Sequence, residues 1–154
     1  MEQQIKTVKL ILEEVLAKLT IEGQVDFCED DNYPRFIIKT QEAGILIGED
    51  GRHLAALSHI VKKITENKMK NDGLEKFAFF LDVNDYQMKK IEELKNVARV
   101  NAQKARYFKR EVEMEPMSSY DRRIIHSALS EYFDIKTESV GEGMDRRVVI
   151  KPIE

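Results

Sequence analysis

The sequence predicts an α+β fold made of two small domains that a long helix links. Apolar residues recur at helical spacing in several long segments, which predicts amphipathic helices. Short stretches rich in Val, Ile and Phe predict strands, and these strands are grouped instead of alternating regularly with helices. The length of 154 residues suits one domain or two very small ones.

Residues 1–85 are predicted to form the first domain, in the order helix, strand, strand, helix, helix, strand. Asn32, Tyr33 and Pro34 separate its first two strands and predict a hairpin. The predicted elements are a helix at residues 4–19, strands at 25–28 and 35–40, a turn of helix that begins at 43, a helix at 52–66 and a strand at 77–83. The side chains expected to point inward from the helix at 52–66 are Leu54, Leu57, Ile60, Val61 and Ile64.

Residues 86–154 are predicted to form the second domain, which begins with the linking helix at 86–108. The small residues in the apolar stripe of this helix suit close packing against another element. The side chains expected in this buried stripe are Ile91, Leu94, Ala98, Ala102, Ala105 and Phe108. Ser118 and Asp121 have the spacing of a capping box and predict a helix that continues to about residue 132. Two strands, at 136–140 and 146–151, complete the predicted fold.

Charge is distributed unevenly between the two predicted domains. The net charge of −3 combines 11 Lys and Arg against 16 Asp and Glu in residues 1–85 with 14 against 12 in residues 86–154. Residues 94–110 contain six basic side chains and no acidic one. Such a run indicates contact with nucleic acid or a membrane surface, or only a solvated helix face, and charge alone leaves both interpretations open.

A loop bounded by glycines, Gly48-Glu49-Asp50-Gly51, lies between two predicted helices of the first domain. Glycines permit close approach of a ligand, and free amides at a helix N-terminus suit a phosphate. The stretch Gly44-Ile-Leu-Ile-Gly48-Glu-Asp-Gly51-Arg-His-Leu54, in this element order, resembles a KH domain of the prokaryotic type (type II). A KH domain clamps the backbone of single-stranded RNA with its Gly-x-x-Gly loop. The resemblance implies a KH loop made of Gly48, Glu49, Asp50, Gly51 and Arg52.

The two residues between these glycines depart from RNA-binding KH loops, in which one position is commonly cationic. Glu49 and Asp50 are both acidic, which weakens attraction to a phosphate and removes the counterion release that Lys or Arg would supply. Two alternatives follow. Either the amides, helped by Arg52 and His53, still contact RNA, or the KH-like domain serves packing or dimerisation. Asp50 is also a candidate N-cap of the helix that follows.

A second candidate site is the segment Asp121-Arg-Arg-Ile-Ile-His126. Arg122 and His126 lie four residues apart on a predicted helix, so their side chains emerge on one face. A guanidinium and an imidazole, with Arg123 beside them, can bind a phosphate. The alternative is a surface arginine next to a histidine at the edge of the core, because such a pair is common in helices.

Three segments of the second domain together are similar to the C-terminal domain of bacterial Jag proteins, which is named for its Arg-x-x-x-His pair. The segments are Glu115-Pro-Met-Ser-Ser-Tyr-Asp-Arg-Arg-Ile-Ile-His-Ser-Ala-Leu129, Thr137-Glu-Ser139-Val-Gly141-Glu-Gly143 and Arg146-Arg147-Val-Val-Ile150. Jag proteins place a KH domain before this domain, as here, and the similarity runs from about Glu42 onward. The additional N-terminal domain of many Jag proteins is expected to be missing, because the first helix leads straight into the KH-like domain.

The resemblance implies that the second domain binds single-stranded nucleic acid. It implies that Arg122 and His126 are the signature pair, that Ser139 and Gly141 form a binding turn, and that the final strand is rich in arginine. Tyr120 is added as an aromatic face for a base, whereas Tyr132 is expected in the core. The expected nucleic-acid-binding residues are Arg122, Arg123, His126, Ser139, Gly141, Arg146, Arg147, Tyr120, Arg106, Lys109 and Arg110.

The expected function is that of a non-catalytic, bacterial RNA-binding regulator that binds single-stranded RNA, with single-stranded DNA as an open alternative. The second hypothesis is a protein-interaction adaptor, whose KH-like half dimerises with itself or with another KH protein. An enzyme is not expected. His53, His59, His126 and Cys28 lack metal-ligand spacing, and the loop at Gly51 lacks the Lys-Ser/Thr ending of a P-loop. Neither a cofactor nor a metal is therefore expected.

Localisation is inferred from the absence of export signals. The sequence contains no apolar run long enough to span a bilayer and no basic-then-apolar signal peptide. Its single cysteine, Cys28, cannot form an internal disulfide, so nothing indicates an oxidising compartment. We expect a cytoplasmic protein without membrane insertion.

Overall fold

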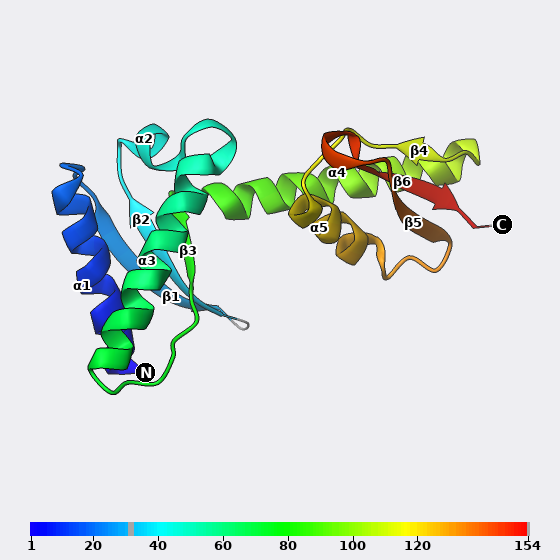
Figure 1. Ribbon diagram of the computed structural model, residues 1–154. Coiled ribbons are helices and arrows are strands. Elements are labelled where there is room, and N and C mark those ends of the chain that lie inside the picture. Colours follow the sequence, from blue (N-terminus) through cyan, green and yellow to red (C-terminus); the bar gives the residue numbers. More distant parts are fainter. Residues whose placement is uncertain (31–32, 154) are drawn as a thin grey trace. The chain divides into compact units, whose positions relative to one another are not determined.

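The chain divides into two compact units, Met1–Gln87 and Met88–Glu154, which we call the N-terminal and C-terminal units. The computed structural model describes residues 1–30 and 33–153. Both units mix helices and strands (Figure 1), which confirms the predicted α+β class. None of the helices in the described ranges is long and apolar enough to cross a membrane.

The N-terminal unit is a three-stranded sheet with two longer helices, α1 and α3, across one face (Figure 1). Its elements are α1 (Glu2–Lys18), β1 (Gln24–Asp30), β2 (Tyr33–Lys39), α2 (Ala43–Ile47), a 3-10 turn (Glu49–Gly51), α3 (Arg52–Asn71) and β3 (Phe80–Val83). The strand order is β1-β2-β3, with β1 antiparallel and β3 parallel to β2. This is the predicted order of helices and strands. Of the predicted hairpin, Tyr33 and Pro34 begin β2, and Asn32 lies outside the described residues.

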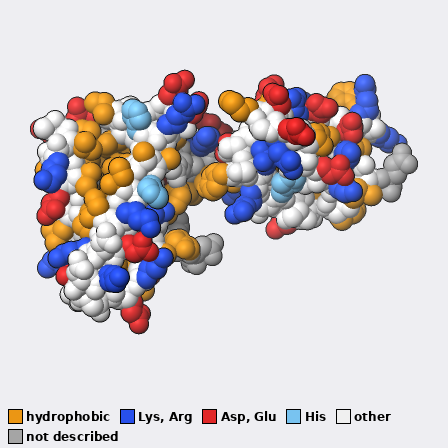
Figure 2. Space-filling view, viewed as in Figure 1, with side chains coloured by type: hydrophobic (Ala, Val, Ile, Leu, Met, Phe, Trp, Pro, Cys, Tyr) orange, Lys and Arg blue, Asp and Glu red, His pale blue; other side chains and the backbone are white. Residues whose placement is uncertain are grey.

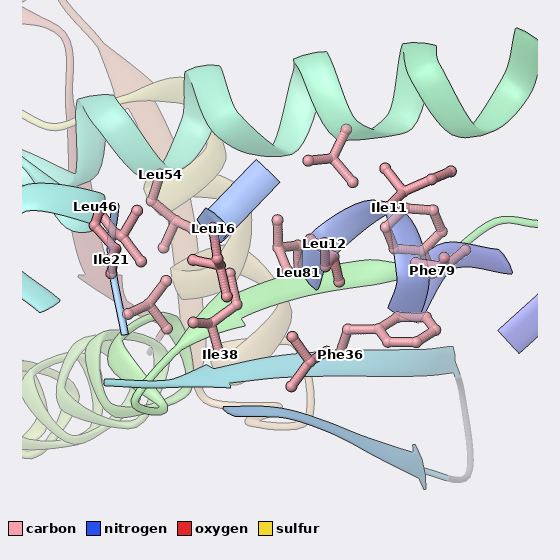
Figure 3. Packing of buried hydrophobic residues seen from close by; sticks show 14 of the residues in the cluster. Ile11, Leu12, Leu16, Ile21, Phe36, Ile38, Leu46, Leu54, Phe79 and Leu81 are labelled. Carbon is pink, nitrogen blue, oxygen red and sulfur yellow. The ribbon is translucent and has the colours of Figure 1, made fainter. Parts of the chain in front are cut away.

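The core of the N-terminal unit lies between the sheet and its two long helices. Leu12 and Leu16 of α1 point toward Phe36 and Ile38 of β2 and Leu81 of β3, and all five side chains are buried (Figure 3). Phe36 and Ile38 alternate along β2 and therefore share one face of the sheet. Leu54 and Val61 of α3 belong to the same buried cluster, which holds this helix in place and with it the glycine-bounded loop that leads into it.

Two side chains that the sequence placed in this core are on the surface instead. Ile60 is 54% exposed and Ile64 is 41% exposed. The buried side chains of α3 are Leu54, Val61, Thr65 and Met69. The prediction was wrong because the inward face includes a threonine, which an apolar pattern does not count. The helix also continues to Asn71 rather than ending near 66, and β3 begins at Phe80 rather than at 77.

The C-terminal unit builds its core from two helices and the antiparallel sheet β4-β6-β5. Its elements are α4 (Tyr86–Phe108, which begins in the N-terminal unit), β4 (Val112–Glu113), α5 (Ser119–Leu129), β5 (Ile135–Val140), a 3-10 turn (Gly143–Asp145) and β6 (Arg147–Pro152). Ala98, Ala102 and Ala105 are buried, as predicted, and share a cluster with Ile125 of α5 and Ile150 of β6. The small alanine side chains let α4 lie close to the elements that it covers.

The sequence did not predict β4. It consists of two residues only, with Val112 opposite Ile150 and Glu113 opposite Val149. A pair of residues cannot show the alternation that identifies a strand. This strand forms because β6 offers a free edge beside it.

Candidate nucleic-acid interface

Helix α5 begins at the predicted cap. Ser118 lies before the first helical residue in an extended conformation, and its Oγ accepts a hydrogen bond of 3.1 Å from the amide of Asp121. This bond satisfies an amide that would otherwise have no partner at the helix N-terminus. It also sets the register of α5, so that Ile125 and Leu129 are buried while Arg122 and His126 lie beside that stripe.

The imidazole of His126 joins α5 to β5. Its Nδ1 lies 2.7 Å from the Thr137 hydroxyl and its Nε2 lies 2.8 Å from the Ser139 hydroxyl. Thr137 and Ser139 alternate along β5 and therefore face the same side of the strand. A neutral imidazole has one donor and one acceptor, and each hydroxyl can serve either role. His126 therefore positions two hydroxyl groups at the surface of the sheet.

Burial lowers the pKa of His126 below its ordinary value, and the nearby positive charge of Arg122 lowers it further. Both effects disfavour the protonated imidazole. The side chain is half-buried. Figure 2 shows Lys and Arg side chains, interspersed with Asp and Glu, on the visible face of the C-terminal unit. The neutral form of His126 is therefore the one that holds Thr137 and Ser139 near pH 7.

Arg122 is anchored to the segment that precedes its own helix. Its Nη1 donates a hydrogen bond of 2.7 Å to the carbonyl oxygen of Met117. A guanidinium carries five N–H donors in a planar fork. The bond to Met117 therefore orients the fork while leaving it capacity for an anion. Arg122 and His126 thus share one face, as the spacing predicted, and both contact protein groups.

Arg123 and Tyr120 lie at the exposed side of this region. Arg123 is exposed, and Tyr120 of the first turn of α5 is 54% exposed. Arg146, before β6, is also exposed and donates a long bond of 3.4 Å to the Gly141 carbonyl. Arg147 is held more closely, by a 3.1 Å bond to the Asp145 carbonyl and a 3.6 Å ion pair with Glu113. Arg123 and Arg146 are therefore the guanidinium groups most available to a ligand in this region.

Gly141 is required by the turn between β5 and β6. Its φ is +91°, and a Cβ there would lie 2.9 Å from the carbonyl oxygen of Asp145. A side chain would therefore clash with the backbone in a conformation that already favours glycine. The turn directs Arg146 back toward the carbonyl of Gly141 and keeps it near the end of β5 that carries Ser139.

The basic residues at the end of α4 divide into two groups. Arg106 points back to the protein, where its Nη2 donates a 2.7 Å bond to Asp134 and its guanidinium lies 4.5 Å from the centre of the Tyr132 ring. Tyr132 packs against the core, as expected. Lys109 and Arg110 are exposed. Arg106 therefore ties α4 to the segment before β5, whereas the next two cations face solvent.

The glycine-bounded loop of the N-terminal unit is tightly built. Gly48 has a φ of +70°, and a Cβ there would lie 2.4 Å from the ring of His53, which is 2.8 Å from the Ile45 carbonyl. Gly51, in the left-handed conformation, is the N-cap of α3, with no side-chain capping bond. Asp50 is therefore not the N-cap that the sequence suggested; it has a φ of +53° and, like Glu49 and Arg52, is exposed.

A shallow apolar pocket of about 260 Å³ adjoins this loop. Its lining residues are Leu19, Thr20, Ile21, Glu42, Ile45, Leu46, His53 and Leu57. The pocket places apolar side chains next to the loop, while the two side chains between its glycines are carboxylates. Within residues 1–30 and 33–153, no group of three or more His, Cys, Asp or Glu side chains is arranged to hold a metal ion.

Sequence reasoning missed Thr137 and the carbonyl of Met117. Thr137 lies two residues before Ser139, and the period of two in a strand is the signal that could have paired them. The Met117 carbonyl belongs to the backbone of an irregular segment, so no residue type identifies it.

Comparison with known proteins gives a family match and several relatives. The R-3-H domain family matches residues 92–152. "RNA-binding protein KhpB" of Clostridium symbiosum is 33% identical over 132 residues, covering 86% of this chain and 58% of the relative. The protein of the same name from Bacillus subtilis (strain 168) is 31% identical over 148 residues, covering 95% and 69%. The match to the one from Lactiplantibacillus plantarum is 28% over 136 residues, covering 88% and 41%. The chain thus spans between about two fifths and two thirds of the length of these relatives.

Proposed function

This chain belongs to the family of the bacterial RNA-binding proteins named KhpB, and from that premise we propose that it is a non-catalytic protein that binds single-stranded RNA. The observation that carries the proposal is the arrangement around His126 in the C-terminal unit. One imidazole holds the hydroxyls of Thr137 and Ser139 while Arg122 is fixed nearby on α5. Hydroxyl groups and guanidinium forks are groups that proteins commonly offer to phosphates.

We assign two kinds of role within this surface. Arg122, His126 and Gly141 position the helix, the strand and the turn, because each is held by contacts within the unit. Arg123 and Arg146 contact phosphates, since both side chains are exposed and, among the residues that the structure describes, the Arg146 guanidinium is held only by a long hydrogen bond to the Gly141 carbonyl. Tyr120 offers a stacking face to a base. Arg147 and Arg106, engaged by Glu113 and Asp134, support the surface from behind.

The N-terminal unit is proposed to be a type II KH domain. Its element order, its mixed sheet and the loop between Gly48 and Gly51 support this assignment. Because Glu49 and Asp50 are exposed carboxylates, the unit contributes little to RNA affinity in the proposal. We propose that the protein acts as an RNA-binding regulator in the cytoplasm.

The proposal is tested by removing the two exposed guanidinium groups. Arg123→Ala/Arg146→Ala is expected to weaken binding of a labelled 12-nucleotide single-stranded RNA, measured by fluorescence anisotropy at several salt concentrations. Each lost phosphate contact lowers the slope of log K against log salt by about 0.7, so the pair lowers it by about 1.4. The unfolding midpoint should not change, because both side chains lie at the surface.

The matched control is Lys63→Ala/Lys68→Ala, which makes the same change in net charge on the exposed side of α3. It should leave the slope unchanged. Equal losses in the two variants would mean that only net charge attracts RNA. The proposal would be overturned if the wild-type protein bound no RNA at low salt. The same measurement with single-stranded DNA of the same sequence shows whether the protein recognises the 2′-hydroxyl.

A second candidate function, self-association or pairing with another KH protein, is favoured by the surface of the N-terminal unit. Leu10 of α1, Ile60 and Ile64 are 52%, 54% and 41% exposed. The two helices pack against each other, and Figure 2 shows apolar side chains gathered over this part of the unit. Exposed apolar area of this kind marks interaction surfaces. We propose it as the dimerisation face of an adaptor.

Light scattering of the wild-type chain and of Ile60→Asp/Ile64→Asp tests this second function. We expect a concentration-dependent dimer for the wild type and a monomer for the variant, because two carboxylates in an apolar interface cost several kcal/mol. Circular dichroism should be the same for both, since the two side chains are exposed. A wild-type chain that stays monomeric at high concentration and binds no KH partner would rule the adaptor out.

A further inference from the structure

The last turn of α4 exposes two adjacent aromatic side chains. Tyr107 is 81% exposed and Phe108 is 56% exposed. Their ring centroids are 5.0 Å apart and the rings are nearly perpendicular, at 88°. The buried residues of α4 are alanines, the last of them Ala105, so the sequence-based placement of Phe108 in this stripe was wrong and neither ring takes part in it. Large aromatic groups usually contribute to a core or an interface, and this pair belongs to neither core cluster formed by residues 1–30 and 33–153.

The backbone holds the aromatic pair at a fixed helix end rather than on a loose loop. The amide of Arg110 donates to the carbonyl of Ala105 at 3.3 Å, and Lys109 between them has a φ of +51°. This is the pattern of a Schellman motif, in which the left-handed residue is usually glycine. A lysine there costs about 1 kcal/mol of backbone strain. The motif places a cation directly after the two rings.

The charge around the pair indicates what it would take. The guanidinium of Arg110 lies 6.0 Å from the centre of the Phe108 ring, and Lys109 is exposed beside it. Residues 94–110 contain no acidic side chain. Aromatic faces among cations fit a ligand that is planar and anionic at once, and single-stranded nucleic acid has both properties. An apolar protein segment would pack against the rings but would give the cations no anionic partner.

A cleft next to the aromatic pair extends this surface. It measures about 620 Å³ and is lined by Arg106, Lys109, Asp134, Pro152 and Ile153. Lys109 thus belongs both to the aromatic end of α4 and to the cleft. A strand that crosses the rings therefore has space for its next nucleotide on the same unit.

We propose that Tyr107 and Phe108 form a base-stacking platform, which with Lys109 and Arg110 holds one or two successive nucleotides of a single strand. This inference rests on the proposed function, because the strand is the RNA bound by the C-terminal unit. The perpendicular rings cannot stack on one base together, so each offers its own face. The platform adds affinity that depends on the bases, whereas Arg123 and Arg146 act on the phosphates.

The test compares an RNA with bases and one without. Tyr107→Ala/Phe108→Ala should bind a 12-nucleotide oligoadenylate about tenfold more weakly than the wild type does. On an abasic oligonucleotide of the same length, variant and wild type should bind equally, because no base is left to stack. The salt slope should stay unchanged in this variant and fall by about 1.4 in Lys109→Ala/Arg110→Ala. The control Val97→Ala/Val100→Ala removes two half-exposed apolar side chains from the same helix and should change none of these values.

A fluorescence reading gives an independent measure. The chain has no tryptophan, so Phe108→Trp introduces a single reporter, and oligoadenylate should quench its emission while the abasic strand does not. Wild-type binding with unchanged affinity in Tyr107→Ala/Phe108→Ala overturns the platform and leaves the proposed function standing. An equal loss on both oligonucleotides overturns it too, since the effect would not come from stacking. If the wild type binds neither the oligoadenylate nor the abasic oligonucleotide, both the platform and the proposed function are overturned.

Discussion

Replacing Arg122 and His126 together by alanine should both destabilise the C-terminal unit and abolish most of its RNA binding. The imidazole bonds the hydroxyls of Thr137 and Ser139, and the guanidinium bonds the Met117 carbonyl. Loss of partners for half-buried polar groups costs about 1–3 kcal/mol of unfolding free energy. Because the pair positions the groups that contact RNA, its loss should also lower RNA affinity by about 10- to 100-fold. Urea unfolding followed by circular dichroism, and ultraviolet crosslinking to RNA, measure the two effects.

The contrast with Arg123→Ala/Arg146→Ala separates positioning from direct contact. That variant should lose RNA affinity without losing stability, whereas Arg122→Ala/His126→Ala should lose both. If the second variant unfolds at the same urea concentration as the wild type, the positioning role of the pair is wrong.

The pH dependence of stability gives a control specific to His126. Because the native pKa of His126 lies below the ordinary value of 6.5, the unfolded chain takes up more protons as the pH falls. The contribution of His126 to stability is therefore complete above pH 6.5 and is lost as the pH falls below that value toward the native pKa. The difference in unfolding free energy between wild type and His126→Gln should shrink over this range. A difference that does not change with pH would contradict the sign.

Replacing Glu49 and Asp50 together by lysine should convert the N-terminal unit into an RNA-binding one. The change removes two exposed carboxylates and adds two cations between Gly48 and Gly51, next to the N-terminus of α3. Two added phosphate contacts should steepen the salt slope by about 1.4 and raise affinity about tenfold at low salt. Anisotropy is best measured in the Arg123→Ala/Arg146→Ala background, so that the gain comes from the loop. Lysine at the left-handed Asp50 position costs about 1 kcal/mol, which limits but does not remove the gain.

Glu49→Gln/Asp50→Asn is the matched control, because it removes the negative charges and keeps the size of both side chains. It should give a smaller gain than the lysine pair, since it ends repulsion without adding attraction. Equal affinity for all three loops would show that this loop does not lie near RNA, and would favour the adaptor function for the N-terminal unit.

The local sequence determined the features that depend only on residues close together in the chain. The cap at Ser118 followed from its spacing to Asp121, because a capping bond joins residues three apart. The buried alanines of α4 followed from helical periodicity. The shared face of Arg122 and His126 followed from the same geometry. The positive φ angles in the loop at 48–51 fit its glycines, because glycine adopts such backbone conformations readily and other residues rarely do.

The tertiary structure decided everything that depends on residues far apart in the chain. The period of α3 could not show that Thr65 is buried while Ile60 and Ile64 are exposed, because that depends on how the helix lies against its sheet. Strand β4 exists only because β6 is beside it. The engagement of Arg106 by Asp134, 28 residues away, separates it from Lys109 and Arg110 in a run that reads as uniformly basic.

The same distinction between local sequence and distant contacts applies to the functional residues. The sequence by itself determined that Arg122 and His126 share a helix face and that basic residues gather near the end of α4. Only the folded chain showed that His126 forms hydrogen bonds with two hydroxyls of β5. It also showed that Arg123 and Arg146 are exposed in the same region. Hydrogen bonds and exposure depend on which distant residues meet, and a linear pattern of residue types does not contain that information.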